Sequence, residues 1–301
     1  MRRYYMNRLF ALIIMLLVPL HAFGAEEIRY KFAHSLYTDD KGVGMKRPEG
    51  IACSSDRLVI ADTGNGRMLL YSIVDGEPKG GKEVQLTQVI YPIRLAMTSK
   101  GDLYILDERQ RKVALVNAEG AFKQYLEITG LPLEGTVVPA AICLDSQDSL
   151  YVLDIAGGRV LVFDNEGKYQ RQIALPKEYG FITDLTVDAR GTVFLLDSVK
   201  ALVYSNAKDP AVFAAVTEKL KDYMKFPSNI AAGESGMLYI TDQNGGGIVA
   251  VRPDGTAKRL FSLGWKEGSL RYPAQICLDR GGDLFVADRE NSRVQQFVPL
   301  K

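Results

Sequence analysis

The sequence predicts an all-β fold, a six-bladed β-propeller, from two observations. An apolar strand that ends in aspartate recurs six times, at Asp62, Asp107, Asp154, Asp197, Asp242 and Asp288. The steps between these aspartates are 45, 47, 43, 45 and 46 residues. A period in the forties, filled with short β-rich runs and glycine turns, is typical of a propeller in which each repeat is one blade. We therefore expect a single propeller domain over residues 25–301.

Residues 1–24 have the pattern of a signal peptide. Basic residues at Arg2, Arg3 and Arg8 precede a short apolar run, and small residues follow just before Ala25. The run is short for a bilayer span, so we expect cleavage, no membrane span in the mature chain, and a periplasmic or extracellular location. Removal of this segment leaves 34 basic and 36 acidic residues. Such a balance gives no bulk attraction for nucleic acid or anionic lipid.

Five of the six repeats begin with a proline that precedes an apolar inner strand. Proline suits this place because it fixes φ and lacks an N–H, which the first residue of a strand can spare. The fourth repeat has Ile182 instead. The prolines are Pro48, Pro92, Pro139, Pro227 and Pro273.

The turn after the repeat aspartate carries the more specific pattern. The segments 62–67 and 288–293 share the sequence D-x-x-N-x-R. Aspartate and asparagine can bond the backbone N–H groups of such a turn, and arginine can brace it with several donors. Together with the proline, this pattern resembles the NHL repeat of six-bladed propellers, which includes exported bacterial proteins. The resemblance covers residues 47–298 and is strongest in the first and last repeats.

Outer strands fit four of the repeats, at Val84–Val89, Phe122–Ile128, Tyr169–Leu175 and Ala257–Leu263. None follows the sixth repeat, because the chain stops four residues after Phe297. The alternating segment Ile28–Phe32 has no local partner. We therefore expect it to pair with Arg293–Val298 and to close the ring.

The segment 209–225 has a helical pattern. Asp209 can cap a helix, Pro210 suits its first position, and apolar residues recur on one face. The sequence therefore predicts a helical insertion at the outer edge of the fourth blade.

The three cysteines predict no disulfide. Cys143 and Cys277 hold equivalent positions in the third and sixth repeats, and Cys53 lies one position further along in the first. The third and sixth blades face each other across the ring, too far apart for a bond. With no C-x-x-C motif, we expect three buried, reduced cysteines.

Candidate binding residues lie where the inner strands begin. Six-bladed propellers that act on small molecules do so at this mouth of the central channel. The residue before the first apolar residue of each inner strand is usually glycine in NHL repeats, as at Gly50. Trp265, together with Arg271, Tyr272 and Tyr91, is a further candidate on the same face, where it forms a contact patch or packs across a blade junction. The polar residues at the inner-strand position are Arg94, Asp184, Asn229 and Gln275.

Glu49, Asp184 and Asn229 offer oxygen ligands of the kind that Ca²⁺ or another divalent cation uses. This trio is similar to the site of gluconolactonase-like propellers, which hold one divalent ion with Glu, Asn and Asp and use it to polarise a lactone carbonyl. The alternative is that Arg94 and Asp184 satisfy each other directly or through water. We expect this alternative, and no cofactor.

Two further kinds of chemistry are disfavoured. One aspartate per blade at the same turn indicates a structural role for the six repeat aspartates. After cleavage only His34 remains, so neither the three-histidine zinc site of NHL-like amidating lyases nor a well-placed Ser-His-Asp triad can be built.

The sequence therefore favours an exported, non-enzymatic binding or scaffold propeller without catalytic residues. We expect a monomer that presents its loop-rich channel-mouth face to a protein or a small ligand, and no nucleic acid partner. The alternative function is a divalent-metal-dependent hydrolase of the gluconolactonase type, with the metal at the channel mouth. The fold alone does not choose between them, because propellers host both.

Overall fold

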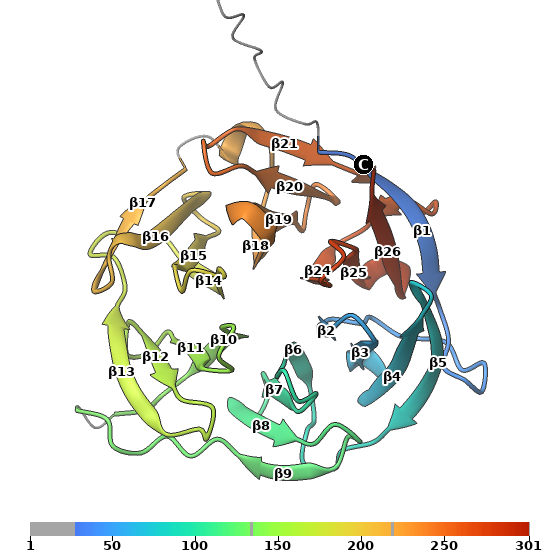
Figure 1. The fold of residues 1–301 in the computed structure, drawn as a ribbon, viewed down its shortest axis with the longest axis horizontal. Helices are drawn as coiled ribbons and strands as arrows, with labels where there is room; N and C mark the ends of the chain where they lie inside the picture. The colour runs from blue at the N-terminus through green and yellow to red at the C-terminus, as the bar shows by residue number, and fades with distance from the viewer. Residues whose placement is uncertain (1–27, 133–134, 218–219, 301) are drawn as a thin grey trace, which may run out of the picture.

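The structure is a computed structural model that describes residues 28–132, 135–217 and 220–300. These residues form six four-stranded antiparallel sheets arranged as a ring around a central channel (Figure 1). Each sheet is one blade, so the predicted six-bladed propeller is confirmed. The predicted signal peptide lies outside the described residues.

In the first three blades the strands follow one another from the channel outward. Blade 1 consists of β2 (Ile51–Cys53), β3 (Arg57–Asp62), β4 (Arg67–Val74) and β5 (Glu77–Val84). Blade 2 consists of β6 (Pro92–Met97), β7 (Leu103–Asp107), β8 (Lys112–Val116) and β9 (Phe122–Tyr125). Blade 3 consists of β10 (Pro139–Leu144), β11 (Leu150–Asp154), β12 (Arg159–Phe163) and β13 (Tyr169–Ala174).

The other three blades repeat this plan. Blade 4 consists of β14 (Ile182–Val187), β15 (Val193–Asp197), β16 (Leu202–Asp209) and β17 (Val212–Ala215), and blade 5 of β18 (Pro227–Ala232), β19 (Leu238–Asp242), β20 (Gly247–Val251) and β21 (Ala257–Leu260). Blade 6 consists of β24 (Pro273–Leu278), β25 (Leu284–Asp288), β26 (Arg293–Pro299) and β1 (Tyr30–Leu36). A short parallel pair, β22 (Ser262–Leu263) and β23 (Ser269–Leu270), connects blades 5 and 6.

The outer strand of blade 6 comes from the start of the described chain. β1 pairs antiparallel with β26, with Tyr30 opposite Pro299 and Leu36 opposite Val294. In Figure 1 the two lie side by side at the rim, one blue and one dark red. The strand runs four residues beyond the segment expected from the sequence.

The core is divided among the six blade junctions. Each buried cluster combines side chains from two neighbouring blades, as Val59 and Ala61 of blade 1 pack with Leu95 and Ile105 of blade 2. The same arrangement joins blade 6 to blade 1, through Phe285 and residues of β2 and β3. A blade therefore buries its faces only against its neighbours, as the repeat pattern predicts.

The predicted helix near 209–225 is wrong. The segment turns at Pro210 and Ala211 and returns as the outer strand β17. The Asp209 carboxylate accepts a hydrogen bond from the backbone N–H of Ala211, at 2.9 Å, which stabilises a turn instead of a helix cap. The open edge of β16 offers backbone hydrogen bonds that outweigh the weak helical pattern.

The helices among the described residues are all short 3₁₀ helices: η1 (Thr63–Asn65), η2 (Leu220–Asp222), η3 (Glu234–Gly236) and η4 (Arg289–Asn291). None of the helices in this part of the chain has the length and apolar character needed to cross a bilayer.

The outer strand of blade 1 begins earlier than the sequence suggested. β4 and β5 are joined by Asp75 and Gly76, whose φ angles are 53° and 78°. An Asp-Gly pair with two positive φ angles makes the two-residue turn that fits a twisted hairpin. The hairpin fixes the strand at Glu77–Val84 instead of Val84–Val89.

The prediction of three reduced cysteines is also wrong. Cys53 of β2 and Cys277 of β24 form a disulfide, with their Cα atoms 6.0 Å apart. These two inner strands are neighbours because the ring closes between blades 6 and 1. Cys143 of blade 3 remains a free thiol.

Candidate functional site

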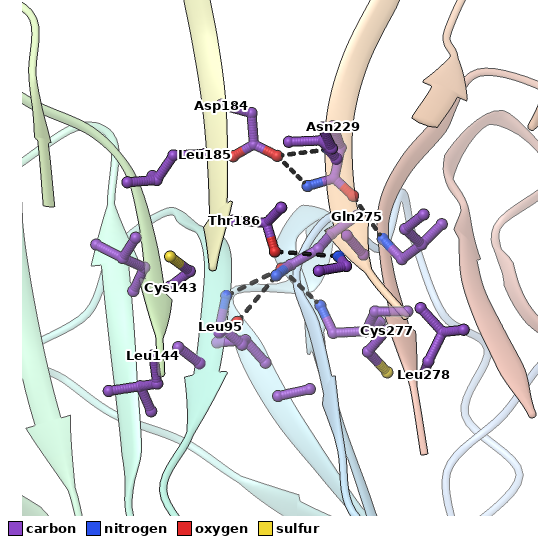
Figure 2. Close-up of a pocket in the computed structure, with 18 of the residues that line it drawn as sticks. Leu95, Cys143, Leu144, Asp184, Leu185, Thr186, Asn229, Gln275, Cys277 and Leu278 are labelled. Atoms are coloured by element: carbon purple, nitrogen blue, oxygen red, sulfur yellow. Dashed lines mark hydrogen bonds between the residues drawn. The ribbon is translucent and has the colours of Figure 1, made fainter. Parts of the chain in front are cut away.

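The inner strands of all six blades line the channel, which holds a cavity of 220 Å³. Figure 2 shows Asp184 and Asn229 together on one side of this cavity, with Gln275 below them. Three of the four polar residues predicted at the inner-strand position therefore face the channel.

These three side chains bridge neighbouring blades. Asp184 Oδ2 accepts a hydrogen bond from Ile230 N of blade 5, at 2.8 Å. Asn229 Oδ1 accepts one from Ile276 N of blade 6, at 2.9 Å. Because each inner strand is the edge of its sheet, the N–H groups that face the channel need partners from outside the sheet. The polar side chains supply them.

Gln275 makes the widest bridge. Its Oε1 accepts hydrogen bonds from the backbone N–H groups of Ile51 and Leu95, each at 3.0 Å, and its Nε2 donates to Leu95 O at 2.9 Å. It thus connects blade 6 to blades 1 and 2. One physical reason for the bridge is Gly50, which has no side chain to offer at the equivalent place in blade 1.

Asp184 is the most perturbed acid of the channel. Its side chain is almost fully buried, and this burial raises its pKa from 3.8 to about 6. The Arg94 charge and hydrogen bonds from Ile230, Leu185 and Asn229 act in the opposite direction. Asn229 Nδ2 donates to Asp184 Oδ2, so the two are already partners in the absence of any ligand.

Arg94 reaches across the channel from blade 2. Its Nε lies 3.7 Å from Asp184 Oδ1, which bears out the expected contact between the two residues. Its Nη1 donates to Ile93 O at 3.0 Å, and its Nη2 donates to Ser228 O of blade 5 at 3.4 Å. The side chain is 13% exposed. Asp184 lines the channel cavity and Arg94 lines a second cavity, so their contact lies where the two cavities meet.

This second cavity, which we call the vestibule, has a volume of 450 Å³. Arg94, Arg111, Arg289, Glu49 and Glu108 supply its charged groups. Its apolar wall includes Ile93, Val138, Phe181, Ile182, Phe226 and Ala274. A concave site with mostly apolar walls and a few convergent polar groups is the usual form of a ligand pocket.

Glu49 is engaged within the vestibule and away from Asp184. Its Oε1 lies 3.2 Å from Arg289 Nε and accepts a hydrogen bond from Tyr91 OH at 3.3 Å. The structure therefore does not bring Glu49, Asp184 and Asn229 together as one ligand set. Among the described residues, no group of three or more His, Cys, Asp or Glu side chains is arranged to hold a metal ion.

Trp265 lies on the same face but in a separate cavity of 520 Å³. Its side chain is 72% exposed, and the Arg271 guanidinium lies 4.8 Å from its ring centroid. Tyr272 lines this cavity, whereas Tyr91 stacks with Arg109 instead. Gln243 lines both this cavity and the vestibule. The predicted aromatic and basic patch is thus present without Tyr91.

The six repeat aspartates are all fully buried. Each accepts a hydrogen bond from a backbone N–H just before the inner strand of its own blade, as Asp62 does from Lys46 and Asp288 from Arg271, both at 2.6 Å. Arg67 and Arg293 brace the same carboxylates at 2.7 Å. These contacts form a structural turn, as predicted from the repeat.

The comparisons with known families agree with this geometry. A model of the NHL repeat matches residues 270–297, and a model described as a 6-bladed beta-propeller matches residues 119–250. This protein is a six-bladed β-propeller whose last repeat matches the NHL repeat. A search of curated protein sequences gave no significant match.

The propeller is also similar to solved structures of low sequence identity. A streptogramin B lyase is 15% identical with a TM-score of 0.64, and 91% of this chain and 98% of that one are covered. A protein of unknown function from Bacteroides thetaiotaomicron is 16% identical with a TM-score of 0.67, covering 90% and 72%. A gluconolactonase from Xanthomonas campestris is 13% identical with a TM-score of 0.62, covering 90% and 95%. At such identities the likeness concerns the fold alone.

Sequence reasoning missed most of the vestibule. The residue after each repeat aspartate is the position from which these vestibule residues could have been predicted, because the turn directs this residue toward the channel mouth. In blades 1 and 4 the same position is filled by Thr63 and Ser198, whose hydroxyl groups instead donate to backbone carbonyl oxygens of the next blade. Those that line the vestibule are Glu108, Ile155, Gln243 and Arg289.

Proposed function

We propose that this propeller is a binding or scaffold protein without catalytic function, and that the face bearing the repeat-aspartate turns takes up a protein or a small ligand. The observation that carries the proposal is the concentration of exposed large apolar side chains on this face. Exposed apolar side chains that gather on one face of a protein are a feature of interaction sites. The residues are Ile90, Ile155, Tyr179, Phe181, Val199, Leu263, Trp265 and Tyr272.

The state of the charged groups supports binding over catalysis. Arg94 is paired with Asp184, and Arg289 with Glu49, so these two acids already have arginine partners. His34, the histidine of the described residues, lies on the outer strand β1 with its Nε2 3.6 Å from Glu77. It is therefore far from the channel in the ring.

The disulfide supports export as part of the proposal. Stable disulfides occur mainly in oxidising compartments, such as the periplasm and the cell exterior. The Cys53–Cys277 bond joins the first and last blades and is consistent with the signal-like segment at residues 1–24. We therefore propose a periplasmic or extracellular location.

The second candidate is a metal-dependent hydrolase of the gluconolactonase type. It is favoured by the likeness in fold to gluconolactonase and by the adjoining side chains of Asp184 and Asn229 in the channel. Metal analysis of the purified protein, with a thermal unfolding titration in Ca²⁺, separates the two candidates. Two results together would favour the hydrolase over the binding protein. The purified wild-type protein would contain stoichiometric metal and hydrolyse a lactone, and Asp184→Asn would lose both the metal and the hydrolysis.

A site-specific cross-linking experiment tests the binding proposal. A photoreactive amino acid is introduced at Phe181 or Trp265 on the mouth face, and at Val74 or Val212 as matched controls, since these are exposed apolar residues in hairpins at the opposite ends of their blades. In the producing cell we expect one dominant cross-linked product from the mouth-face positions only. Equal labelling from both sets would remove the basis of the proposal.

A further inference from the structure

Two vestibule arginines have more hydrogen-bond donors than the protein uses. A guanidinium has five N–H donors, and Arg94 directs two of its own to backbone oxygens. Its Nε is buried and forms no hydrogen bond, although the Asp184 charge is near. Arg289 donates no hydrogen bond within the described part of the chain, and its contact with Glu49 is electrostatic only. A buried N–H donor without an acceptor costs free energy, so a ligand that accepts hydrogen bonds from these donors binds favourably.

The charges of the vestibule select the kind of ligand. Three arginines and two glutamates line the vestibule, and the Asp184 carboxylate contacts Arg94 from the channel side. The Glu49 carboxylate is shared by Arg289 and Tyr91, and the Asp184 carboxylate is bonded by Asn229 and the Ile230 N–H. The carboxylates already present would repel a doubly charged phosphate more strongly than a monoanion, so a monoanion fits the site better. Arginine suits a carboxylate because its planar fork bonds both oxygens.

The walls select the rest of the ligand. Phe181, Phe226 and Ile182 line the cavity beside the arginines. Tyr272, which is outside this lining, stacks on the Arg289 guanidinium, whose carbon lies 5.4 Å from the ring centroid. An aromatic or aliphatic group would remove these apolar surfaces from water. A ligand with an apolar body and one acidic end would therefore contact both parts of the site.

We propose that the vestibule binds a carboxylate carried on an apolar body, with the guanidinium groups of Arg94 and Arg289 as its donors. This assignment rests on the proposed binding function and names its ligand chemistry. Either a free amphipathic carboxylic acid or the C-terminal carboxylate of a peptide presents this chemistry. The experiment below distinguishes them.

The first measurement uses matched probes on the intact protein. 4-Phenylbutyrate is compared with 4-phenylbutyramide, and an N-acetylated Phe-Leu-Phe tripeptide with its C-terminal amide, by calorimetric titration. We expect each acid to bind roughly tenfold more tightly than its amide, or better, because a charged carboxylate forms stronger hydrogen bonds with arginine than a neutral amide does. Tighter binding of the tripeptide assigns the peptide source, and tighter binding of phenylbutyrate assigns the free acid. Equal binding of acid and amide, or no binding at millimolar concentration, overturns the proposal.

The second measurement assigns the donors. Arg94→Gln and Arg289→Gln should each weaken binding of the acid roughly tenfold or more, while Arg280→Gln, an exposed arginine at the opposite face, should leave it unchanged. If a variant fails to fold, the wild-type Arg Nε–Hε resonances decide, because those of Arg94 and Arg289 should move on titration with the acid. Unchanged affinity in both variants, or unmoved resonances, overturns the proposal. Cross-links at Phe181 and Trp265 that persist in that case would show that the binding function stands without it.

Discussion

Arg94 Nε lies 3.7 Å from Asp184 Oδ1, so that a single contact from blade 2 to blade 4 spans the mouth of the channel. Asp184 is buried deeply enough that its pKa is about 6 even beside this positive charge. The contact therefore does not fully compensate the cost of burying the carboxylate. It marks the boundary between the channel and the vestibule.

The first prediction concerns the pH dependence of this pair. Because the folded-state pKa of Asp184 lies above its ordinary value of 3.8, the folded protein binds a proton more tightly than the unfolded chain between pH 4 and 6. The contribution of this proton to the free energy of unfolding is present below pH 4 and is lost as the pH rises through about 6. The free energy of unfolding of the wild type, minus that of Asp184→Asn, should fall by roughly 3 kcal/mol at most between pH 4 and pH 7. A difference that does not vary with pH would contradict the assignment.

The second prediction compares two repeat aspartates that have different partners. Asp288 accepts hydrogen bonds from Arg293, Asn291 and Gln295 as well as from a backbone N–H, whereas Asp197 is bonded by four backbone N–H groups. Asp288→Ala leaves the buried Arg293 charge without its carboxylate and should cost about 3–5 kcal/mol. Asp197→Ala leaves only neutral donors unpaired and should cost about 1–3 kcal/mol. Chemical unfolding of both variants checks the order, and equal losses would show that the arginine contributes little.

The ring itself could be predicted from the sequence because its signal is repeated. Each blade contains the same apolar strand and the same aspartate, and the burial of those aspartates shows that the period marks one structural position. The failures lie where one segment differs from the repeat. At 209–225 the helical spacing of apolar residues gave no information about the unpaired edge of β16, which decided the outcome.

The candidate site was less predictable, because contacts between distant blades determine it. Asp184, Asn229 and Gln275 were found from their register, yet each has a bridging role that depends on the backbone of the next blade. Arg289 was missed because the turn after Asp288 was considered only for its structural role. The disulfide was missed because Cys277 was compared with Cys143 across the ring instead of with Cys53 in the adjoining blade.

The third prediction concerns the outer strand of blade 6. In the intact protein β26 pairs with β1 over Val294–Pro299. Deletion of residues 28–36 removes β1 and would leave β26 as an exposed edge strand. Exposed edges promote association between chains. We expect a lower melting temperature and concentration-dependent aggregation, measured by calorimetry and light scattering. A truncated protein that stays monomeric with an unchanged melting temperature would show that β1 is dispensable for closure.

The fourth prediction concerns the Cys53–Cys277 disulfide, which joins residues 224 positions apart in the sequence. A cross-link over so long a loop restricts the unfolded chain strongly, so its loss should cost about 2–5 kcal/mol. The wild-type protein should therefore melt at a lower temperature in the presence of a reductant. Cys53→Ser should show the lower temperature with and without the reductant. Cys143→Ser, the matched control, keeps the bond and should respond to the reductant as the wild type does.

The contrary result would be equally informative. If the reductant leaves the wild-type melting temperature unchanged while thiol labelling shows that the bond is broken, the β1–β26 pairing and the apolar junction of blades 6 and 1 suffice to hold the ring closed. The disulfide would then have no measurable role in closure. Its place in the channel wall, beside the hydrogen bond from Ile51 N to Gln275, favours the opposite outcome, because separation of β2 from β24 would also break that hydrogen bond.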